Sequence, residues 1–286
     1  MDYAIQVKNL FKNYDGFSLK NVTFDVPKGS IMGFVGQNGS GKTTTIKALL
    51  NLIHLDGGKI LIENNDSIFG EEKIKEMVGV VFDECCFPES LNIKDIDKIM
   101  KGIYEKNWQR SKFFSYTKRF KLPEKKCVKE FSRGMKMKLS IAVALSHDAK
   151  ILILDEPTSG LDPVIRDEIL TILMEFIQDE EHTVLLSSHI TSDMEKIADY
   201  IIFIHEGSIV LTENKDDLIY NYGIIKCSEN DLSYINKDYI IGVRRGYFGC
   251  EVLTNCKSKV EKINKPFVID KANLEDILLF VVKGEK

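Results

Sequence analysis

The stretch that decides the fold reads Gly36-Gln37-Asn38-Gly39-Ser40-Gly41-Lys42-Thr43. A short apolar segment, 31–35, precedes it, and a run of helical character, 42–53, follows it. The glycines let the backbone turn sharply and point successive N–H groups inward at the positive end of a helix. Lys42 can then reach the terminal phosphates of a nucleotide, and the Thr43 hydroxyl can bind a magnesium ion. The alternative is a glycine-rich turn that binds nothing, but the order of strand, loop and helix favours a nucleoside triphosphate site.

Length and composition restrict the class of protein. The 286 residues suit one large domain, or a domain of about 200 residues with a smaller appendage. The apolar share of 44% is ample for a large core, and the net charge of −4 gives no overall attraction to nucleic acid or anionic lipid. No two of the six cysteines have CxxC spacing, which favours free thiols over a zinc site. We expect an intracellular chain, because it shows neither a signal peptide nor a long apolar run.

Hydrophobic periodicity predicts the elements around the loop. Alternation or short apolar runs predict strands at 5–11, 21–26, 59–62, 78–82, 151–154, 183–186, 200–205 and 208–212. Helical spacing predicts helices at 42–53, 71–77, 93–104, 108–120, 135–146 and 163–178. The helices at 93–104 and 108–120 should form a subdomain inserted between the two halves of the nucleotide core. Tyr14 lies near the first strand turn, where its ring can either stack on a purine base or pack on its neighbour.

Polar side chains follow two of the buried strands. Asp155 and Glu156 come directly after the apolar run 151–154, and His189 follows the strand that begins at 183. Ligands of open α/β sheets bind at the carboxyl ends of the strands. Two carboxylates near a triphosphate predict one on magnesium and one on water. A lone histidine is more often structural than catalytic, so both roles of His189 stay open at this point.

Two helix starts carry further motifs. Ser132-Arg133-Gly134 reads, by itself, as a capped helix start, because serine is a good N-cap. Asp162 is predicted to cap the helix that begins with Pro163 at its first position.

After the composition change at 213–217, the remaining residues alternate as short strands and end in an amphipathic helix at 274–282. This tail predicts a small α+β appendage in which we find no chemistry.

Taken together, the motifs resemble those of the nucleotide-binding subunit of an ATP-binding cassette (ABC) transporter. The resemblance covers roughly residues 3–221 and includes six motifs in the family's order. It implies an α/β fold, with a P-loop NTPase core, an antiparallel β subdomain and a helical insert at about 84–148. We therefore expect an ABC ATPase domain at 1–221 and a small α+β domain at 222–286.

The resemblance assigns a role to each motif. ATP would be bound by Gly36, Gln37, Asn38, Gly39, Ser40, Gly41, Lys42, Thr43 and Thr44, with Tyr14 stacked on adenine. Mg²⁺ would be held by Thr43, Asp155 and Asp83, and catalysis would depend on Glu156, His189 and Lys42. The signature segment Ser132-Arg133-Gly134-Met135 would reach the nucleotide on a second subunit, and Ser159-Gly160-Leu161-Asp162 matches the D-loop.

The implied partners are a second ATPase subunit, identical or different, and an integral membrane permease, with no nucleic acid. The chain would then be cytoplasmic and peripheral on the inner face of the cell membrane. Two alternatives fit less well. A soluble ABC ATPase acting on ribosomes or DNA would carry two cassettes or long coiled coils, whereas this chain has one Walker A loop and no sustained heptads. A non-hydrolytic ATP-binding regulatory module is disfavoured by the intact Glu156.

The chain departs from the family pattern in two places. Phe131, Arg133 and Met135 stand where the family usually has Leu, Gly and Gln. Asp83 stands where most members carry the Q-loop glutamine; both bind magnesium through oxygen, but aspartate is shorter and charged. These features, with Leu274-Glu275-Asp276-Ile277, look like the ABC-2 type bacterial exporter ATPases of drug, antibiotic or peptide efflux.

Overall fold

A six-stranded sheet forms the centre of the molecule. The computed structural model describes residues 2–68, 70–247, 249–263 and 267–285. The strand order is β10-β9-β3-β8-β7-β6. The bounds are β3 Ile31–Val35, β6 Val78–Val81, β7 Ile151–Asp155, β8 Thr183–Ser188, β9 Tyr200–His205 and β10 Ser208–Asn214. All neighbours in this sheet are parallel except β9 and β10, which pair antiparallel.

The apolar runs form parallel strands because both faces of this sheet are covered. Every residue of β3 and of β7 is buried. Within β7, Ile151 and Ile153 pack into the cluster on one face, and Leu152 and Leu154 into the cluster on the other. This alternation follows from the two-residue period of a strand. The buried strands predicted at 151–154 and 183–186 are confirmed.

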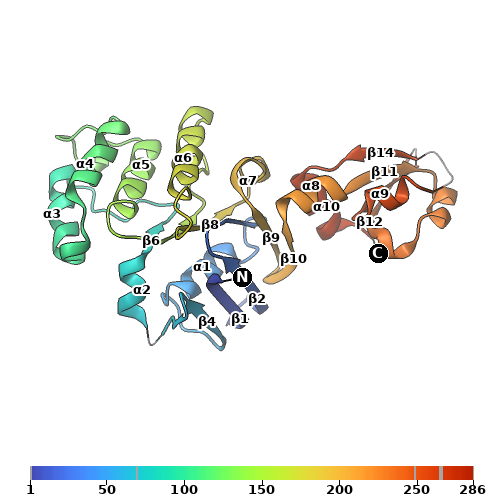
Figure 1. Ribbon diagram of the computed structural model, residues 1–286, viewed down its shortest axis with the longest axis horizontal. Helices are drawn as coiled ribbons and strands as arrows, with labels where there is room; N and C mark the ends of the chain where they lie inside the picture. The colour runs from blue at the N-terminus through green and yellow to red at the C-terminus, as the bar shows by residue number, and fades with distance from the viewer. Residues whose placement is uncertain (1, 69, 248, 264–266, 286) are drawn as a thin grey trace.

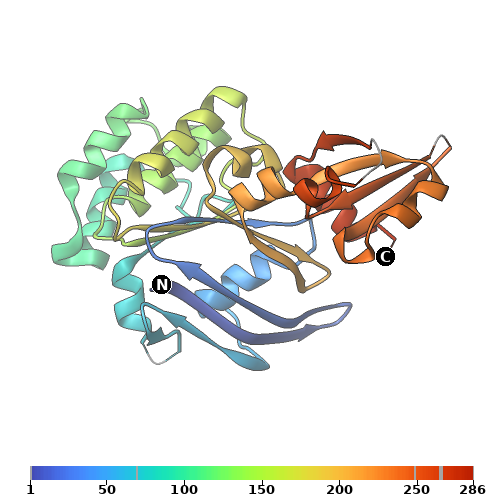
Figure 2. The same ribbon diagram turned by 45° about the vertical axis from the view of Figure 1, so that its right-hand side comes forward.

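An antiparallel sheet and helix α1 cover the first face (Figure 2). The sheet has the order β2-β1-β4-β5, with β1 Tyr3–Tyr14, β2 Phe17–Pro27, β4 Gly57–Ile62 and β5 Asn65–Asp66. Helix α1 spans Lys42–Leu49, so the predicted extension to residue 53 is wrong. Asn51 adopts a φ of 53°, a left-handed conformation that asparagine tolerates and that cannot continue a helix. Helix α2, Glu71–Met77, leads into β6.

The other face carries the helices that follow the insert and the second half of the core. They are α5 Arg133–Ala144, α6 Pro163–Phe176 and α7 Thr191–Ile197. The predicted caps are present: Ser132 accepts from the amide of Met135 at 3.3 Å, and Asp162 accepts from Val164 and Ile165 at 3.1 Å each. Helix α6 ends at Phe176 and α5 at Ala144, two residues earlier than predicted in each case.

The helical insert lies between β6 and β7, at the left of Figure 1. It contains α3 Ile93–Tyr104, η1 Glu105–Asn107, α4 Arg110–Arg119 and η2 Val128–Glu130, followed by α5. Helix α4 starts two residues later than predicted, because Trp108 is buried ahead of it and donates to Asp97 Oδ1 at 3.0 Å. His147, just beyond α5, stacks on Tyr104 of α3 with ring centroids 4.1 Å apart. Burial lowers the pKa of His147 from 6.5 to about 4.

The C-terminal residues form a third sheet at the right of Figure 1, reached through α8 Lys215–Asn221. Its order is β12-β13-β11-β14, with β11 Gly223–Cys227, β12 Ile240–Gly246, β13 Gly249–Thr254 and β14 Val268–Lys271. The short elements η3 Glu229–Tyr234, η4 Lys237–Tyr239 and α9 Lys257–Val260 connect these strands and were not predicted. Helix α10, Leu274–Lys283, packs Ile277 and Phe280 into the core cluster of the cassette. Its Leu274 amide also donates to Glu195 of α7 at 2.8 Å.

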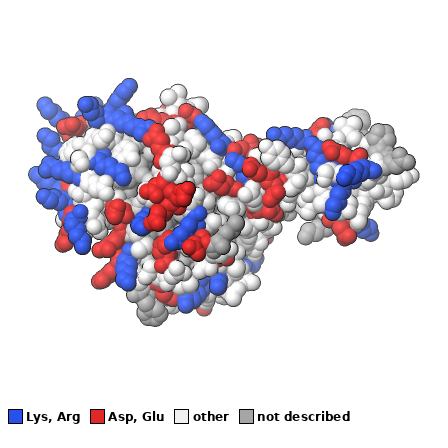
Figure 3. Space-filling view, viewed as in Figure 1, with Lys and Arg blue, Asp and Glu red and all other residues white. Residues whose placement is uncertain are grey.

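Charge is unevenly spread over the surface. Figure 3 shows Lys and Arg side chains gathered over the helical insert at the left, and Asp and Glu side chains near the centre. The net charge of −4 therefore does not describe the insert, whose visible face is basic. Within the described residues, no helix combines the length and the apolar character needed to cross a membrane.

Candidate active site

The predicted phosphate-binding loop, residues 36–43, connects β3 to α1 and requires glycine at two positions. A Cβ on Gly36 would lie 2.5 Å from the backbone oxygen of Ile204, where no side chain fits. Gly41 has a φ of 113°, a conformation that other residues rarely adopt. Helix α1 begins directly after it, and no side chain caps its first turn. The first amides of α1 are therefore available to an anion at the positive end of the helix.

Lys42, the first residue of α1, is buried, with only 5% of its surface exposed. Its ammonium donates to the carbonyl oxygens of Gly36 at 2.7 Å and Gln37 at 3.2 Å. It also lies 3.1 Å from Glu156 Oε1. A buried ammonium is stable only when it is paired, and here the loop and the carboxylate supply the partners. The same position holds a positive charge ready for phosphate oxygens.

Asp155 and Glu156, at the end of β7, are both bonded to Ser187 of β8. The Asp155 carboxylate accepts from Ser187 Oγ at 2.6 Å, and the amide of Glu156 donates to the same hydroxyl oxygen at 3.1 Å. Ser187 therefore bridges the ends of β7 and β8. Glu156 adopts a φ of 52°, a left-handed conformation that is costly for a residue with a side chain. This turn lets two adjacent carboxylates face the same space.

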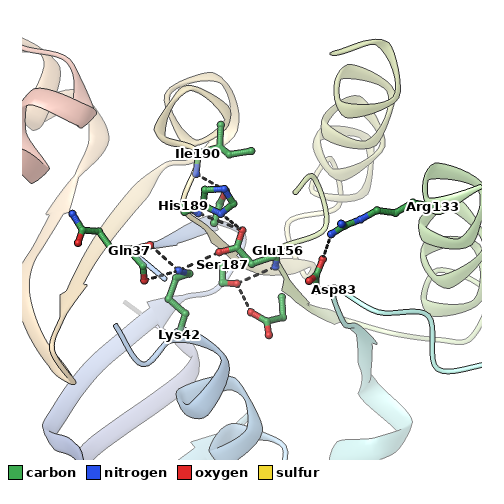
Figure 4. Close-up of polar contacts among 11 residues, drawn as sticks. Gln37, Lys42, Asp83, Arg133, Glu156, Ser187, His189 and Ile190 are labelled. Atoms are coloured by element: carbon green, nitrogen blue, oxygen red, sulfur yellow. Dashed lines mark hydrogen bonds and ion pairs between the residues drawn. The ribbon is translucent and has the colours of Figure 1, made fainter. Parts of the chain in front are cut away.

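Glu156 and His189 are hydrogen-bonded to each other. His189 Nδ1 lies 2.7 Å from Glu156 Oε2, and the His189 amide donates to the same oxygen at 3.4 Å. Figure 4 shows Lys42, Glu156 and His189 in one chain of contacts above the loop. A carboxylate held between an ammonium and an imidazole is positioned rather than free to rotate. The arrangement can hold a water molecule and accept its proton.

These side chains face one cavity of about 670 Å³. It is lined by Gly16, Phe17, Asn38, Gly39, Gly41, Lys42, Thr43, Thr44, Asp83, Asp155, Glu156, Ser159 and His189. Residues from the first hairpin, the loop, and the ends of β6, β7 and β8 thus meet at one place. The sequence-based grouping of the loop with Asp155, Glu156 and His189 agrees with this geometry. The Gln37 carbonyl accepts a hydrogen bond from Lys42, and Ser40 of the loop is buried.

The aromatic ring at the cavity belongs to Phe17, which sequence reasoning missed. Tyr14 does not line the cavity; it is 45% exposed and its ring lies 5.4 Å from the Lys12 ammonium. The two residues are partners across the hairpin. Because they flank the same Asp15-Gly16 turn, position alone did not separate them. Gly16, which lies between the two rings in sequence, also lines the cavity, so no local sequence signal separates Phe17 from Tyr14.

The signature segment lies outside this cavity. Ser132 is exposed at the start of α5, and Gly134 packs against Ile165 of α6. Arg133 Nη2 lies 2.6 Å from Asp83 Oδ1, an ion pair that the sequence did not predict. Met135 is half-buried against the core cluster. The structure therefore does not bring Ser132, Gly134 and Met135 to the nucleotide cavity of their own chain.

The D-loop segment, 159–162, runs from the nucleotide cavity to the start of α6. Ser159 lines the nucleotide cavity, whereas Asp162 caps α6. Leu161 packs on the core cluster, and Gly160 has a φ of 65°. The left-handed turn at Gly160 carries the chain from the cavity to the start of α6.

The fold and this cavity are those of an ABC ATPase. A family model described as ABC transporter matches residues 19–159, and a curated relative is 35% identical over most of its length. The chain belongs to the ABC transporter ATP-binding family. It is an ATP-binding and ATP-hydrolysing subunit, as its phosphate loop and carboxylate pair indicate.

Three similar proteins are informative about the extent of the likeness. The lantibiotic transport ATP-binding protein SrtF of Streptococcus pyogenes is 35% identical, over 76% of this chain and 96% of SrtF. The uncharacterized ABC transporter ATP-binding protein YhcH of Bacillus subtilis (strain 168) is 30% identical, over 99% of this chain and 92% of YhcH. The solved structure of cbiO1 from Clostridium perfringens, part of the ABC transporter complex cbiONQ, is 27% identical with a TM-score of 0.65. It covers 76% of this chain and 91% of its own.

Proposed function

We propose that this chain drives export through a separately encoded membrane permease, using ATP hydrolysed at the cavity above the phosphate loop. SrtF is named for lantibiotic transport, and cbiO1 is part of a transporter complex, which supports transport over a soluble or purely regulatory role. The proposed cargo class is a peptide or drug of the kind that ABC-2 exporters handle. The chain would work at the cytoplasmic face of the membrane, held there by the permease.

The cavity fits Mg²⁺ by the chemistry of its donors. The Thr43 hydroxyl and the Asp155 and Asp83 carboxylates line it, and Mg²⁺ prefers oxygen ligands. Among the described residues, no group of three or more His, Cys, Asp or Glu side chains could hold a metal by itself. Mg²⁺ usually needs few protein ligands beside substrate phosphates. Bound with ATP, it would supply positive charge that offsets the charge of the phosphates.

The chain's own residues divide the remaining work. Lys42 and the first amides of α1 bind the phosphates and stabilise the charge that develops on the transferred group. Glu156 orients the attacking water and accepts its proton, a contribution of about 10²–10⁴ in rate for a positioned base. His189 holds the Glu156 carboxylate through the contact at 2.7 Å. In the proposed complex, its ring would also contact the γ-phosphate.

We further propose that each site is completed by a second ATPase subunit. Ser132 is exposed, and its hydroxyl contacts only its own helix start among the bonds described for it. In a head-to-tail dimer, Ser132 and the Gly134 amide would bind the γ-phosphate on the facing subunit. Hydrolysis would remove the group that bridges the subunits, and the dimer would reopen. The helical insert would pass this motion to the permease.

The observation that carries the proposal is the contrast between two groups of residues. Lys42, Glu156 and His189 are assembled around the loop, whereas Ser132 lies away from it. The test is co-purification of the tagged chain from membranes. We expect a membrane protein of about six spans to accompany it, and ATPase activity to rise in that complex. A chain that purifies alone and hydrolyses ATP at its full rate would contradict the proposal.

A further inference from the structure

The two departures from the family pattern meet in the structure. Asp83 follows β6, and Arg133 is the first residue of α5. They are 50 positions apart in sequence, yet Arg133 Nη2 lies 2.6 Å from Asp83 Oδ1. Figure 4 shows this pair beside, and separate from, the Lys42–Glu156–His189 contacts. Two substitutions that looked independent therefore form one interaction.

Asp83 belongs to two cavities at once. It lines the nucleotide cavity and also a second cavity of about 430 Å³ between the core and the insert. Arg133 lines only the second one. The carboxylate therefore stands on the boundary between the two spaces. Asp83 thus lines the cavity in which Mg²⁺ is proposed to bind, while its Oδ1 is held by the guanidinium.

Arg133 is also fixed against the D-loop. A Cβ on Gly160 would lie 3.0 Å from Arg133 Nη1, so the guanidinium packs directly against the backbone there. The arginine thus connects the end of β6, the start of α5 and the turn before α6. Its neighbour Ser132 is the residue proposed to reach the second subunit. The position of Arg133 is therefore coupled to the position of the signature helix.

We propose that Arg133 is a positioning residue that competes with Mg²⁺ for the Asp83 carboxylate. This inference rests on the proposed function, because it requires Mg²⁺ to enter with ATP at the cavity. Without nucleotide, the ion pair holds the start of α5 to the core. When Mg²⁺ and ATP bind, Asp83 turns to the metal, the pair opens, and the signature helix is released toward a facing subunit.

The expected effect is small, because both side chains are half exposed. Arg133 is 52% exposed and Asp83 44%, and exposed ion pairs contribute little to stability. Competition from such a pair weakens Mg²⁺-dependent binding by no more than about fivefold. A change of this size is measurable by calorimetric titration. It is also suited to a residue that must release its partner in every cycle.

The test compares ATP affinity with Mg²⁺ and with EDTA, in a Glu156→Gln parent that does not consume ATP. We expect Arg133→Gln to lower the Kd for ATP about two- to fivefold in Mg²⁺ and to leave the EDTA value unchanged relative to the control. The matched control is Lys136→Gln, which removes one positive charge from the same helix and lines the same second cavity, but pairs with Glu89 at 3.7 Å. Arg133→Lys should keep the parental Kd.

A second variant isolates the shared carboxylate. In an Asp83→Asn background, Arg133→Gln should bring no further gain, because the contested charge is gone. The proposal is overturned if Arg133→Gln matches Lys136→Gln in Mg²⁺, if it changes the EDTA value equally, or if its gain persists with Asp83→Asn. Failure of the proposed function looks different. If the parent itself binds ATP no better with Mg²⁺ than with EDTA, the Mg²⁺ site within the proposed function and this inference both fail.

Discussion

The two ends of the catalytic machinery differ in how complete they are. At the phosphate loop, Lys42, Glu156 and His189 are mutually bonded and face one cavity. At the start of α5, Ser132 is exposed and its side chain only caps its own helix. Helices α1 and α5 both bury residues in the core clusters, so the difference is not one of folding. It supports the proposal that the first region is one half of an ATP site and that the second completes the site of another subunit.

The largest expected effect is at the phosphate-loop cavity. Glu156→Gln should keep ATP binding, because Lys42 and the loop amides remain, but lower turnover by about 10²–10⁴ through loss of the general base. ATP affinity and the rate of phosphate release, measured on one preparation, test both parts. Glu181→Gln, at an exposed carboxylate paired with Lys150, is the control and should behave as wild type. Near-normal turnover of Glu156→Gln would remove the base role.

The second effect is on the exposed half. Ser132→Ala should lower ATP hydrolysis by about 10²-fold, the loss typical of one donor to a developing charge. It should leave ATP affinity of the isolated chain within twofold, because Ser132 does not line its own cavity. Ser132→Thr keeps both the hydroxyl and the helix cap and serves as the control. If Ser132→Ala weakens ATP binding to the isolated chain, the two regions are not separate.

A third experiment decides which aromatic ring contacts the base. Phe17→Ala should raise the Kd for ATP about tenfold, because stacking on one base contributes roughly 1–3 kcal/mol. Tyr14→Ala should change it less than twofold, since Tyr14 does not line the cavity. Fluorescence titration of both variants measures this. The opposite ranking would return the stacking role to Tyr14, as the family resemblance implies.

The smallest effect concerns His147, which follows α5 and stacks on Tyr104 of α3. Burial lowers the pKa of His147 from 6.5 to about 4, so the unfolded chain binds this proton more readily and acid destabilises the fold. Between about pH 7.5 and about pH 6, this residue should cost about 0.8 kcal/mol of unfolding free energy. Chemical denaturation at both pH values measures the loss. His147→Phe keeps a ring against Tyr104 but cannot titrate, and should show a shallower dependence. If His147→Phe loses as much unfolding free energy between these two pH values as the wild type, His147 is not the cause of the loss.

Local patterns predicted the central parts of the fold and of the site. The phosphate loop, the buried strand before Asp155, and the caps at Ser132 and Asp162 depend on residues that are neighbours in sequence. Their chemistry can therefore be read one segment at a time. The placement of His189 beside Glu156 also followed, because parallel strands end at one edge of a sheet.

Contacts between distant segments were not predictable in this way. The Asp83–Arg133 pair joins residues 50 positions apart, and nothing local to either indicates the other. The packing of α10 on the core depends on the path of the whole C-terminal sheet. Whether Tyr14 or Phe17 lines the cavity depends on how the hairpin lies against the loop, which alternation does not specify. In each case tertiary geometry, rather than residue type, decided the outcome.

The central claim is that one chain holds only half of each ATP-hydrolysing site. The most direct measurement is ATP hydrolysis per chain at rising protein concentration, with the oligomeric state followed by sedimentation in the same samples. The account predicts that monomeric chain binds ATP but does not turn it over, and that activity appears together with the dimer. A strictly monomeric sample that hydrolyses ATP at the full rate would contradict it.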